Sequence, residues 1–517
     1  MKILLINPPF PILPNETRYA SPPLGLAYIA AVLEEKGHTV RIVDCVAAGY
    51  ATESNWGDGR RYYGLSRTEI IANIVDFKPQ LIGISCLFST VANIVIEIAA
   101  ICKRQLKNVK VVLGGTHPTV FAEKIAAEEV VDYVIKGEGE HALLQLVEHL
   151  YKQRSLDAVS NLFCYKSGVA YSTKRSFIDD LDALPRPARH LLDLEKYIEI
   201  GRMHGENGSG VRTTTLITSR GCPFDCVYCS IHPVWGYKYR PRSPENVLAE
   251  IEALYHDHDI RHFLFEDDNL TLNRQRATAI FSGIAERFPA ITWSTPNGVA
   301  VFTLDKDLLS LIKDSGCSRL SLAVESGCQR TLDEIIRKPL KLEKAKEVAA
   351  SCRQLGLPTT AFFVLGLPGE TVGSMEQSMR FAESLPVSSL SIMAATPYPG
   401  TRLYKICQEN GYFVGNFEPD RLYTLNPQIQ TQDFLPCDVR RLTARAYFGH
   451  ALKHPGGNLR RFWQKLRASP ISTLSFFLNI LENQIGNLTH SKNQPTLFKI
   501  GDEGYGIDKA AAFHQKR

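Results

Sequence analysis

The stretch Ser219-Arg220-Gly221-Cys222-Pro223-Phe224-Asp225-Cys226-Val227-Tyr228-Cys229 places three of the chain's twelve cysteines within eight residues. Their spacing is C-x3-C-x2-C. Three thiolates on one loop can bind a single soft metal centre, and iron–sulfur clusters are held by cysteine thiolates. Glycine, proline and aspartate between the cysteines favour a loop over a core strand. The stretch therefore predicts a metal site with three protein ligands and an open position on the metal.

Two other interpretations of these cysteines exist. A structural zinc ion needs a fourth ligand, and His232 stands three residues after Cys229. Alternatively, three buried cysteines cluster by chance. Cys86, Cys102 and Cys317 stand alone in apolar surroundings, where a small buried thiol is expected. Twelve cysteines in 517 residues are too few for a disulfide scaffold.

Strand and helix patterns alternate from residue 213 onward. The expected strands cover residues 214–218, 262–266, 291–296, 318–324, 359–365 and 390–395, with helical patterns between them. Six βα repeats predict a partial (β/α)6 barrel, smaller than the eight-fold form. Functional residues are expected at the carboxyl ends of barrel strands, and the cysteine stretch follows the first strand.

Cys222, Cys226 and Cys229, with the aromatic Tyr228 before the last cysteine, resemble the signature of the radical S-adenosylmethionine (radical SAM) superfamily. Further segments are similar to later strand ends of that family's barrel: 292–298, 322–327, 362–371 and 396–401. The resemblance covers about residues 213–410. It implies that the three cysteines hold a [4Fe–4S] cluster, that Tyr228 lies at the cofactor site, and that SAM chelates the fourth iron. Reductive cleavage of SAM then gives a 5′-deoxyadenosyl radical, which abstracts hydrogen from a substrate.

Other strand ends supply candidate cofactor-binding residues. Glu325 follows an apolar strand and could accept the ribose hydroxyls of SAM, or it is a solvated strand-end charge. Gly366 lets the backbone approach a ligand closely, or it belongs to an ordinary turn. Glu266 and Asp267 stand where the family faces the methionine end of SAM, although helix capping explains them equally well. No residue is assigned a catalytic role.

Arg240 and Arg242 precede a helix start at Ser243-Pro244. They could bind a carboxylate, or they lie on a solvated face.

The first 152 residues also alternate between strand and helix patterns. Strands are expected at residues 2–6, 38–44, 81–85, 109–114 and 132–136. This order predicts a doubly wound, Rossmann-like parallel sheet covered on both faces. Ligands of such sheets bind beyond the carboxyl ends of the strands. One edge is therefore expected to gather residues 7–9, 44–49, 85–87, 114–117 and 137–140.

This first unit resembles the cobalamin-binding domain found ahead of many radical SAM barrels. The order of elements, the Ser85-x-Leu87 segment and the Gly114-Gly115 turn carry the resemblance. It implies that Ser85, Gly114 and Gly115 contact the nucleotide tail of cobalamin, with Leu87 in the same segment. Tight packing at strand ends is the alternative for these residues.

Val46 marks a departure from the family pattern. Members that displace the lower base of cobalamin often carry D-x-H-x-x-G, with the histidine as lower cobalt ligand. The corresponding segment runs from Asp44 to Gly49, with Val46 in the histidine position. Valine cannot ligate cobalt. Either cobalamin binds with its lower face covered by an apolar side chain, which favours low-coordinate cobalt, or the domain has lost cobalamin and only supports the barrel.

The composition suggests four segments: a cobalamin-binding unit at 1–152, a linker at 153–212, the barrel at 213–415 and a basic helical extension at 416–517. Residues 440–517 hold 13 Lys or Arg against 4 Asp or Glu, whereas the whole chain carries a net charge of only +5. Basic amphipathic helices with aromatic residues are expected at 440–452 and 458–466. Such helices either pack on the parent domain or touch a membrane surface. Residues 485–517 are expected to be partly disordered.

These features together predict a cobalamin-dependent radical SAM enzyme. The most direct expectation is methylation of an unactivated carbon, with one SAM methylating cobalt and a second SAM giving the radical. An oxidative cyclase or rearrangement enzyme without methyl transfer is an alternative, as is a non-catalytic cobalamin sensor with a vestigial barrel. An RNA methylthiotransferase is excluded because the N-terminal cysteines Cys45, Cys86, Cys102 and Cys164 do not cluster.

The expected partners are a small-molecule substrate and a reductant such as flavodoxin or ferredoxin. The small net charge speaks against a nucleic-acid partner. No transmembrane segment is expected, because no run of about 18 apolar residues occurs. The N-terminus lacks the features of a signal peptide, and a soluble cytoplasmic protein is expected.

Overall fold

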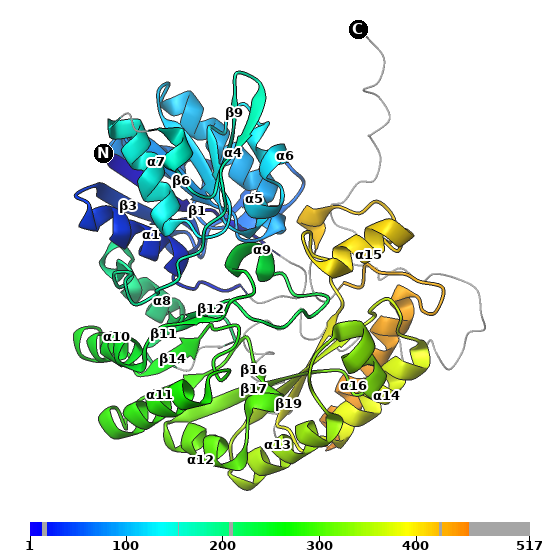
Figure 1. Ribbon diagram of the computed structural model, residues 1–517. Helices are drawn as coiled ribbons and strands as arrows, with labels where there is room; N and C mark the ends of the chain where they lie inside the picture. The colour runs from blue at the N-terminus through cyan, green and yellow to red at the C-terminus, as the bar shows by residue number, and fades with distance from the viewer. Residues whose placement is uncertain (13–17, 153–154, 206–209, 423–425, 454–517) are drawn as a thin grey trace.

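The computed structural model describes residues 1–12, 18–152, 155–205, 210–422 and 426–453. Two α/β units lie one above the other in Figure 1, the first in blue to cyan and the second in green to yellow. Each unit is built on its own sheet, and the order of helices and strands follows the alternation expected from the sequence.

The first unit is built on a sheet of order β10-β9-β8-β7-β6-β1-β3. Its parallel part comprises β1 (Lys2–Asn7), β3 (Thr39–Asp44), β6 (Leu81–Ser85), β7 (Lys110–Gly114) and β8 (Tyr133–Ile135). The apolar residues 3–6 of β1 are at most 1% exposed. Such continuous burial is typical of a parallel strand that is covered on both faces.

Helices cover both faces of this sheet. α1 (Leu24–Glu35) packs against α7 (Glu140–Lys152), and α3 (Arg67–Phe77) packs against α4 (Ala92–Gln105). The two pairs bury separate apolar clusters, one including Leu146 of α7 and the other including Ile98 of α4. The doubly wound architecture expected from the sequence is thereby confirmed.

Part of the segment expected to be a linker belongs to this sheet. β9 (Leu162–Lys166) and β10 (Val169–Ser172) form a hairpin that extends the sheet in the antiparallel sense next to β8. A smaller antiparallel sheet, formed by β2 (Phe10–Pro11), β4 (Glu53–Asn55) and β5 (Arg61–Tyr63), accompanies the first unit.

The second unit is an open parallel barrel of order β11-β14-β15-β17-β18-β19 within the described residues. Its strands are β11 (Thr213–Leu216), β14 (His262–Phe265), β15 (Thr292–Ser294), β17 (Cys317–Glu325), β18 (Thr359–Leu365) and β19 (Ser389–Ala394). A short strand, β16 (Val299–Ala300), also pairs with β17. The intervening helices are α10 (Pro244–Asp257), α11 (Arg274–Arg287), α12 (Lys306–Asp314), α13 (Leu342–Gln354) and α14 (Val372–Ser384). The partial barrel predicted from the sequence is confirmed.

The chain continues beyond the barrel through α15 (Arg402–Asn410) to α16 (Pro436–Lys453). α16 packs against α14 and β19, and the Tyr447 hydroxyl accepts a hydrogen bond from the backbone N–H of Ile392 at 2.9 Å. The basic helix expected at 440–452 thus packs on the barrel, while the helix expected at 458–466 and the disorder expected at 485–517 lie outside the described residues. Among the helices that the structure describes, none has the length and apolar character needed to cross a membrane.

Candidate cofactor site

The cysteines lie on a loop that is closed at its base by two short paired strands. β12 (Ser219–Arg220) pairs with β13 (Arg240–Pro241), so residues 221–239 form the loop between them. This loop follows β11 at the carboxyl end of the first barrel strand, where the sequence places it. The strand-end position is where β/α barrels hold their catalytic groups.

The three thiols are partly buried, in contrast to most other cysteines of the chain, which are fully buried. The side-chain amide of Asn269 donates a hydrogen bond to Cys222 Sγ at 3.7 Å. Burial raises the pKa of Cys226 to about 11 and the pKa of Cys229 to about 12. Metal binding to these thiols must therefore release protons, as expected for thiolate ligands.

The donor set fits an iron–sulfur cluster better than a single zinc ion. Among the described residues, no three His, Cys, Asp or Glu side chains converge on one ion. In a cubane cluster each thiolate binds a different iron, so such convergence is not required. His232 Nε2 lies 3.1 Å from the carbonyl oxygen of Cys222, and its ring stacks on Tyr237 at 3.9 Å. His232 is thus engaged elsewhere and is poorly placed to be the fourth zinc ligand.

Glu325 is held in a strained conformation at the end of β17. Its φ is +72°, which is rare for a residue with a side chain and is typical of functional sites. The carboxylate forms a buried ion pair with Lys338 Nζ at 2.9 Å. The alternative interpretation of Glu325 as a solvated strand-end charge is therefore wrong, because the residue is only 7% exposed. Burial and the neighbouring Glu325 carboxylate raise the pKa of Tyr228 well above its usual range. The structure thus joins Glu325 to Tyr228, next to Cys226.

Gly366 lies in the turn that follows β18, with φ of +84°. A Cβ atom here would lie 2.9 Å from Val439 of α16. The backbone N–H groups of Gly366 and Leu367 both donate to Glu370 Oε2 at 2.9 Å. This turn is therefore shaped by a buried carboxylate that the sequence analysis did not single out.

Asp267 and Glu266 follow β14, but their surroundings differ. The buried Asp267 carboxylate accepts hydrogen bonds from the backbone and hydroxyl of Thr218 and from the Ser219 hydroxyl. Glu266 is only partly buried and contacts His204 Nδ1 at 3.0 Å and Asn297 Nδ2 at 3.2 Å. Asp267 thus anchors the start of the cysteine loop, whereas Glu266 contacts polar side chains from two other segments, at His204 and Asn297.

The cobalamin-side candidates gather at the carboxyl ends of β6 and β7. Ser85 and Gly114 are neighbours in register, and Gly115 follows with φ of +113°. A Cβ at position 115 would lie 2.7 Å from the carbonyl oxygen of Cys86, so only glycine fits. Leu87 is 52% exposed and its neighbour Phe88 is 56% exposed. An exposed apolar surface at this edge of the sheet fits a bulky ligand such as a corrin ring.

Val46 lies on α2 (Cys45–Ala48), which directly follows β3. Asp44 caps this helix by accepting a hydrogen bond from the Val46 backbone N–H at 3.0 Å, and it also accepts from Asn7 and Tyr197. The Val46 side chain packs in the core of the first unit and is 7% exposed. It lies at the same edge of the sheet as Gly115, but the strands β6 and β1 lie between β3, which Val46 follows, and β7, which Gly115 follows.

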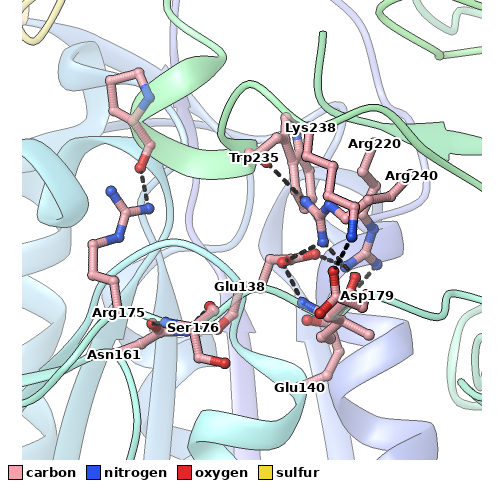
Figure 2. A network of polar contacts seen from close by, with 12 residues as sticks. Glu138, Glu140, Asn161, Arg175, Ser176, Asp179, Arg220, Trp235, Lys238 and Arg240 are labelled. Carbon is pink, nitrogen blue, oxygen red and sulfur yellow. Dashed lines mark hydrogen bonds and ion pairs between the residues drawn. The ribbon is translucent and has the colours of Figure 1, made fainter. Parts of the chain in front are cut away.

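Arg240 and Arg242 are both buried, so their interpretation as a solvated face is wrong. Each pairs with a carboxylate of the protein: Arg240 with Glu138 at 2.7 Å and Arg242 with Glu250 at 2.6 Å. Glu138 belongs to the loop 137–140 of the first unit. That loop therefore contacts the barrel (Figure 2).

Several site residues were missed by sequence reasoning. Lys338, His204, Asn269 and Glu370 contact the predicted residues, but the sequence analysis gave none of them a role. Two of them stand beside residues that were singled out: Asn269 follows the carboxylates that include Glu266 and Asp267, and Glu370 lies in the segment 362–371. Lys338 and His204 have no such signal.

Comparisons with known proteins identify the class to which each of the two α/β units belongs. Residues 12–147 match the B12 binding domain, and residues 216–382 match the Radical SAM superfamily. The chain is 33% identical over 441 residues to the cytidylyl-2-hydroxyethylphosphonate methyltransferase of Streptomyces wedmorensis, with 80% of this chain and 82% of that protein covered. It is 27% identical over 439 residues to the anaerobic magnesium-protoporphyrin IX monomethyl ester cyclase of Rubrivivax gelatinosus, with 83% and 73% covered.

A solved structure supports the fold. OxsB, a cobalamin-dependent SAM radical enzyme with aqua-cobalamin and SAM bound, superposes with a TM-score of 0.70 at 16% identity, covering 95% of this chain and 73% of OxsB. The fold and the site together define an enzyme that combines an iron–sulfur cluster with cobalamin. The chain belongs to the family of cobalamin-dependent radical SAM enzymes, and its cofactors are a [4Fe–4S] cluster, SAM and cobalamin. This membership argues against a non-catalytic sensor and confirms the resemblance found in the sequence.

Proposed function

We propose that this enzyme methylates an unactivated carbon of a small molecule. The observation that carries the proposal is the match to a methyltransferase across both α/β units at 33% identity. When bound, the cluster and SAM supply a 5′-deoxyadenosyl radical after one-electron reduction, and cobalamin supplies the methyl group. The chain's own residues hold these groups and exclude water.

In the barrel, Cys222, Cys226 and Cys229 are the proposed iron ligands, with the fourth iron left to SAM. Glu325 is the proposed acceptor for the ribose hydroxyls, and Lys338 orients its carboxylate at 2.9 Å. Tyr228 supports the same carboxylate. Burial of this group strengthens each polar contact, because water is excluded from it.

Glu266, Asp267 and Gly366 take different parts in the proposal. Glu266 offers a partly exposed carboxylate to the methionine end of SAM, next to His204. Asp267 acts as a positioning residue, because its oxygens already hold Thr218 and Ser219. Gly366 contributes backbone at the end of β18, where the turn approaches the barrel mouth.

In the first unit, Ser85, Gly114 and Gly115 are proposed to contact the nucleotide tail of cobalamin, and Leu87 its apolar surface. Val46 offers no ligand atom to cobalt. We therefore expect the electron paramagnetic resonance (EPR) spectrum of the cob(II)alamin form to lack nitrogen splitting from a protein histidine. Such splitting would contradict this assignment.

Two further parts of the proposal concern organisation and electron supply. We place the end of the first unit near residue 172, later than the boundary expected at 152, because the hairpin β9–β10 belongs to its sheet. The boundaries of the barrel stay near residues 212 and 415. Flavodoxin or ferredoxin is the proposed electron donor, because the radical reaction starts with one-electron reduction of the cluster.

The test uses enzyme produced without oxygen and with cobalamin supplied. The reduced protein is incubated with SAM deuterated in its methyl group and with a small-molecule extract of cells that lack the gene. A product that gains the deuterated methyl group supports methylation. Formation of 5′-deoxyadenosine with an altered product but no transferred label contradicts it.

The second outcome would identify a cyclase or rearrangement enzyme. The 27% identity to the Rubrivivax cyclase favours this second candidate. That protein is matched over a similar share of this chain, so the two candidates differ in reaction and not in architecture.

A further inference from the structure

A buried network of charges joins the two α/β units (Figure 2). Glu138 Oε1 accepts a hydrogen bond from Arg220 Nη1 at 2.7 Å, and Glu138 Oε2 accepts one from Arg240 Nη1 at 2.7 Å. Glu140 Oε1 accepts from Arg220 Nη2 at 2.6 Å. These side chains are at most 4% exposed. Two carboxylates of the first unit thus neutralise two guanidinium groups of the second.

The two arginines stand at the base of the cysteine loop. Arg220 on β12 and Arg240 on β13 are partners in register. Like charges directly opposite each other destabilise a strand pair. Glu138 contacts both guanidinium groups and removes this repulsion. A residue of the cobalamin-binding unit therefore holds closed the base of the loop that carries Cys222.

A second contact holds the other end of the cysteine sequence. α9 (His232–Trp235) begins three residues after Cys229 and packs against α5 (Thr116–Val120), which directly follows Gly115. Gly137 allows a similar close approach, since a Cβ there would lie 3.2 Å from the Val234 carbonyl oxygen. Both flanks of the cysteine sequence thus touch loops that follow the neighbouring strands β7 and β8.

We propose that Glu138 and Glu140 are positioning residues. They fix the position of the cysteine loop, residues 221–239, relative to the edge of the first sheet where cobalamin is expected to bind. Stability alone is a weak explanation, because apolar residues often replace buried ion pairs without loss of stability. Paired hydrogen bonds between arginine and carboxylate define orientation as well as distance. The inference uses the family's cofactors and does not depend on which reaction follows.

The direct test is a distance measurement by pulsed EPR. In the enzyme holding cob(II)alamin and the reduced cluster, the two unpaired spins report their separation. Wild type is expected to give one narrow distribution. Glu138→Gln, Glu140→Gln and Arg220→Lys are expected to broaden or shift it, because each removes a charged hydrogen bond of the network.

The matched control is Glu250→Gln. Glu250 is equally buried and pairs with Arg189 at 3.0 Å and with Arg242 at 2.6 Å, so its ion pairs include none of the four charged groups of the network. This variant removes the same kind of interaction and is expected to keep the wild-type distribution. A structural role without positioning would make all the variants behave alike.

The second readout needs no cofactor. In protein free of iron and cobalamin, alkylation of Cys222 by iodoacetamide is expected to be about tenfold or more faster in Glu140→Gln than in wild type or Glu250→Gln. If Glu138→Gln fails to fold, Glu140→Gln still tests the proposal, because this variant keeps Glu138 and its contacts with both arginines. Unchanged distances and alkylation rates in Glu140→Gln and Arg220→Lys would overturn the proposal. Failure to bind cobalamin would count against the cofactor assignment. The alkylation rates would still decide whether Glu138 and Glu140 position the cysteine loop.

Discussion

Glu370 offers a quantitative test of how the turn after β18 is built. The residue is fully buried, and its Oε2 accepts hydrogen bonds from the N–H groups of Gly366 and Leu367. Its Oε1 has no hydrogen-bond partner among the described residues. Burial raises the pKa of Glu370 from 4.5 to about 7. The folded protein therefore takes up a proton at this position in mildly acidic solution.

The sign and size of the effect follow from proton linkage. Because the pKa of Glu370 is higher in the folded state, its contribution to stability is complete below about pH 4.5 and is lost as the pH rises through about 7. The whole contribution is about 3.4 kcal/mol, at 1.36 kcal/mol for each pKa unit. About 2 kcal/mol of it remains at pH 5.5, and almost none remains at pH 8.

Glu370→Gln removes this dependence. The glutamine oxygen still accepts hydrogen bonds from the backbone N–H groups of Gly366 and Leu367. The amide NH2 group takes the place of Oε1, which has no hydrogen-bond partner in the described part of the chain. This lowers the free energy of unfolding by an amount that does not depend on pH. The measurement is the free energy of unfolding in urea for cofactor-free wild type and variant between pH 5.5 and 8. The variant is expected to gain about 2 kcal/mol relative to wild type over this range.

Glu199→Gln is the control, because the Glu199 side chain is 72% exposed. Its difference from wild type is expected to stay constant with pH. A change below about 0.5 kcal/mol in Glu370→Gln, or a change in the opposite direction, would refute the assignment of a raised pKa to Glu370.

Three further predictions concern other parts of the molecule. Cys226→Ser is expected to lose most of the bound iron and the cluster's visible absorption, and iron content equal to wild type would remove Cys226 from the ligand set. Burial lowers the pKa of His204, but the hydrogen bond to Glu266 and the negative charge of Glu266 raise this pKa by more, so the net pKa is raised. Glu266→Gln should therefore lower the pKa of His204 in an NMR titration. An unchanged pKa would contradict the contact. Arg60 donates to the backbone and side-chain oxygens of Asp420 at 2.9 Å each, so Arg60→Ala should speed limited proteolysis near Asp420 by about tenfold, whereas equal rates would show that this contact does not hold the segment.

Local sequence patterns predicted those parts of the fold whose energetics are local. β6 and β18 were expected at the residues where they occur, because each contains an apolar run that ends at a turn. The cysteine loop was also predicted, since its three ligands lie within eight residues. The hairpin β9–β10 was missed, because exposed apolar residues such as Val169, at 68% exposure, break the alternation expected of a half-buried strand.

Contacts between distant residues could not be predicted. Glu138 and Arg220 are 82 positions apart, and in the sequence each resembles an ordinary surface charge. Only the fold shows that both are buried and paired. The same holds for Glu325: its strand-end position was visible, but its partner Lys338 was not. Charge pairs of this kind depend on tertiary packing, and periodicity contains no signal for them.

The buried network also limits how the two units can move. Separating them at Glu138 would expose or unpair two carboxylates and two guanidinium groups, and breaking a buried ion pair by removing one partner costs about 3–5 kcal/mol. Movement at this point is therefore disfavoured during turnover. The exposed side chains lie elsewhere: Leu87 and Phe88 are more than half exposed, and the His204 side chain is 52% exposed. We therefore expect the contact at Glu138 to stay closed during turnover and to keep the cysteine loop in place.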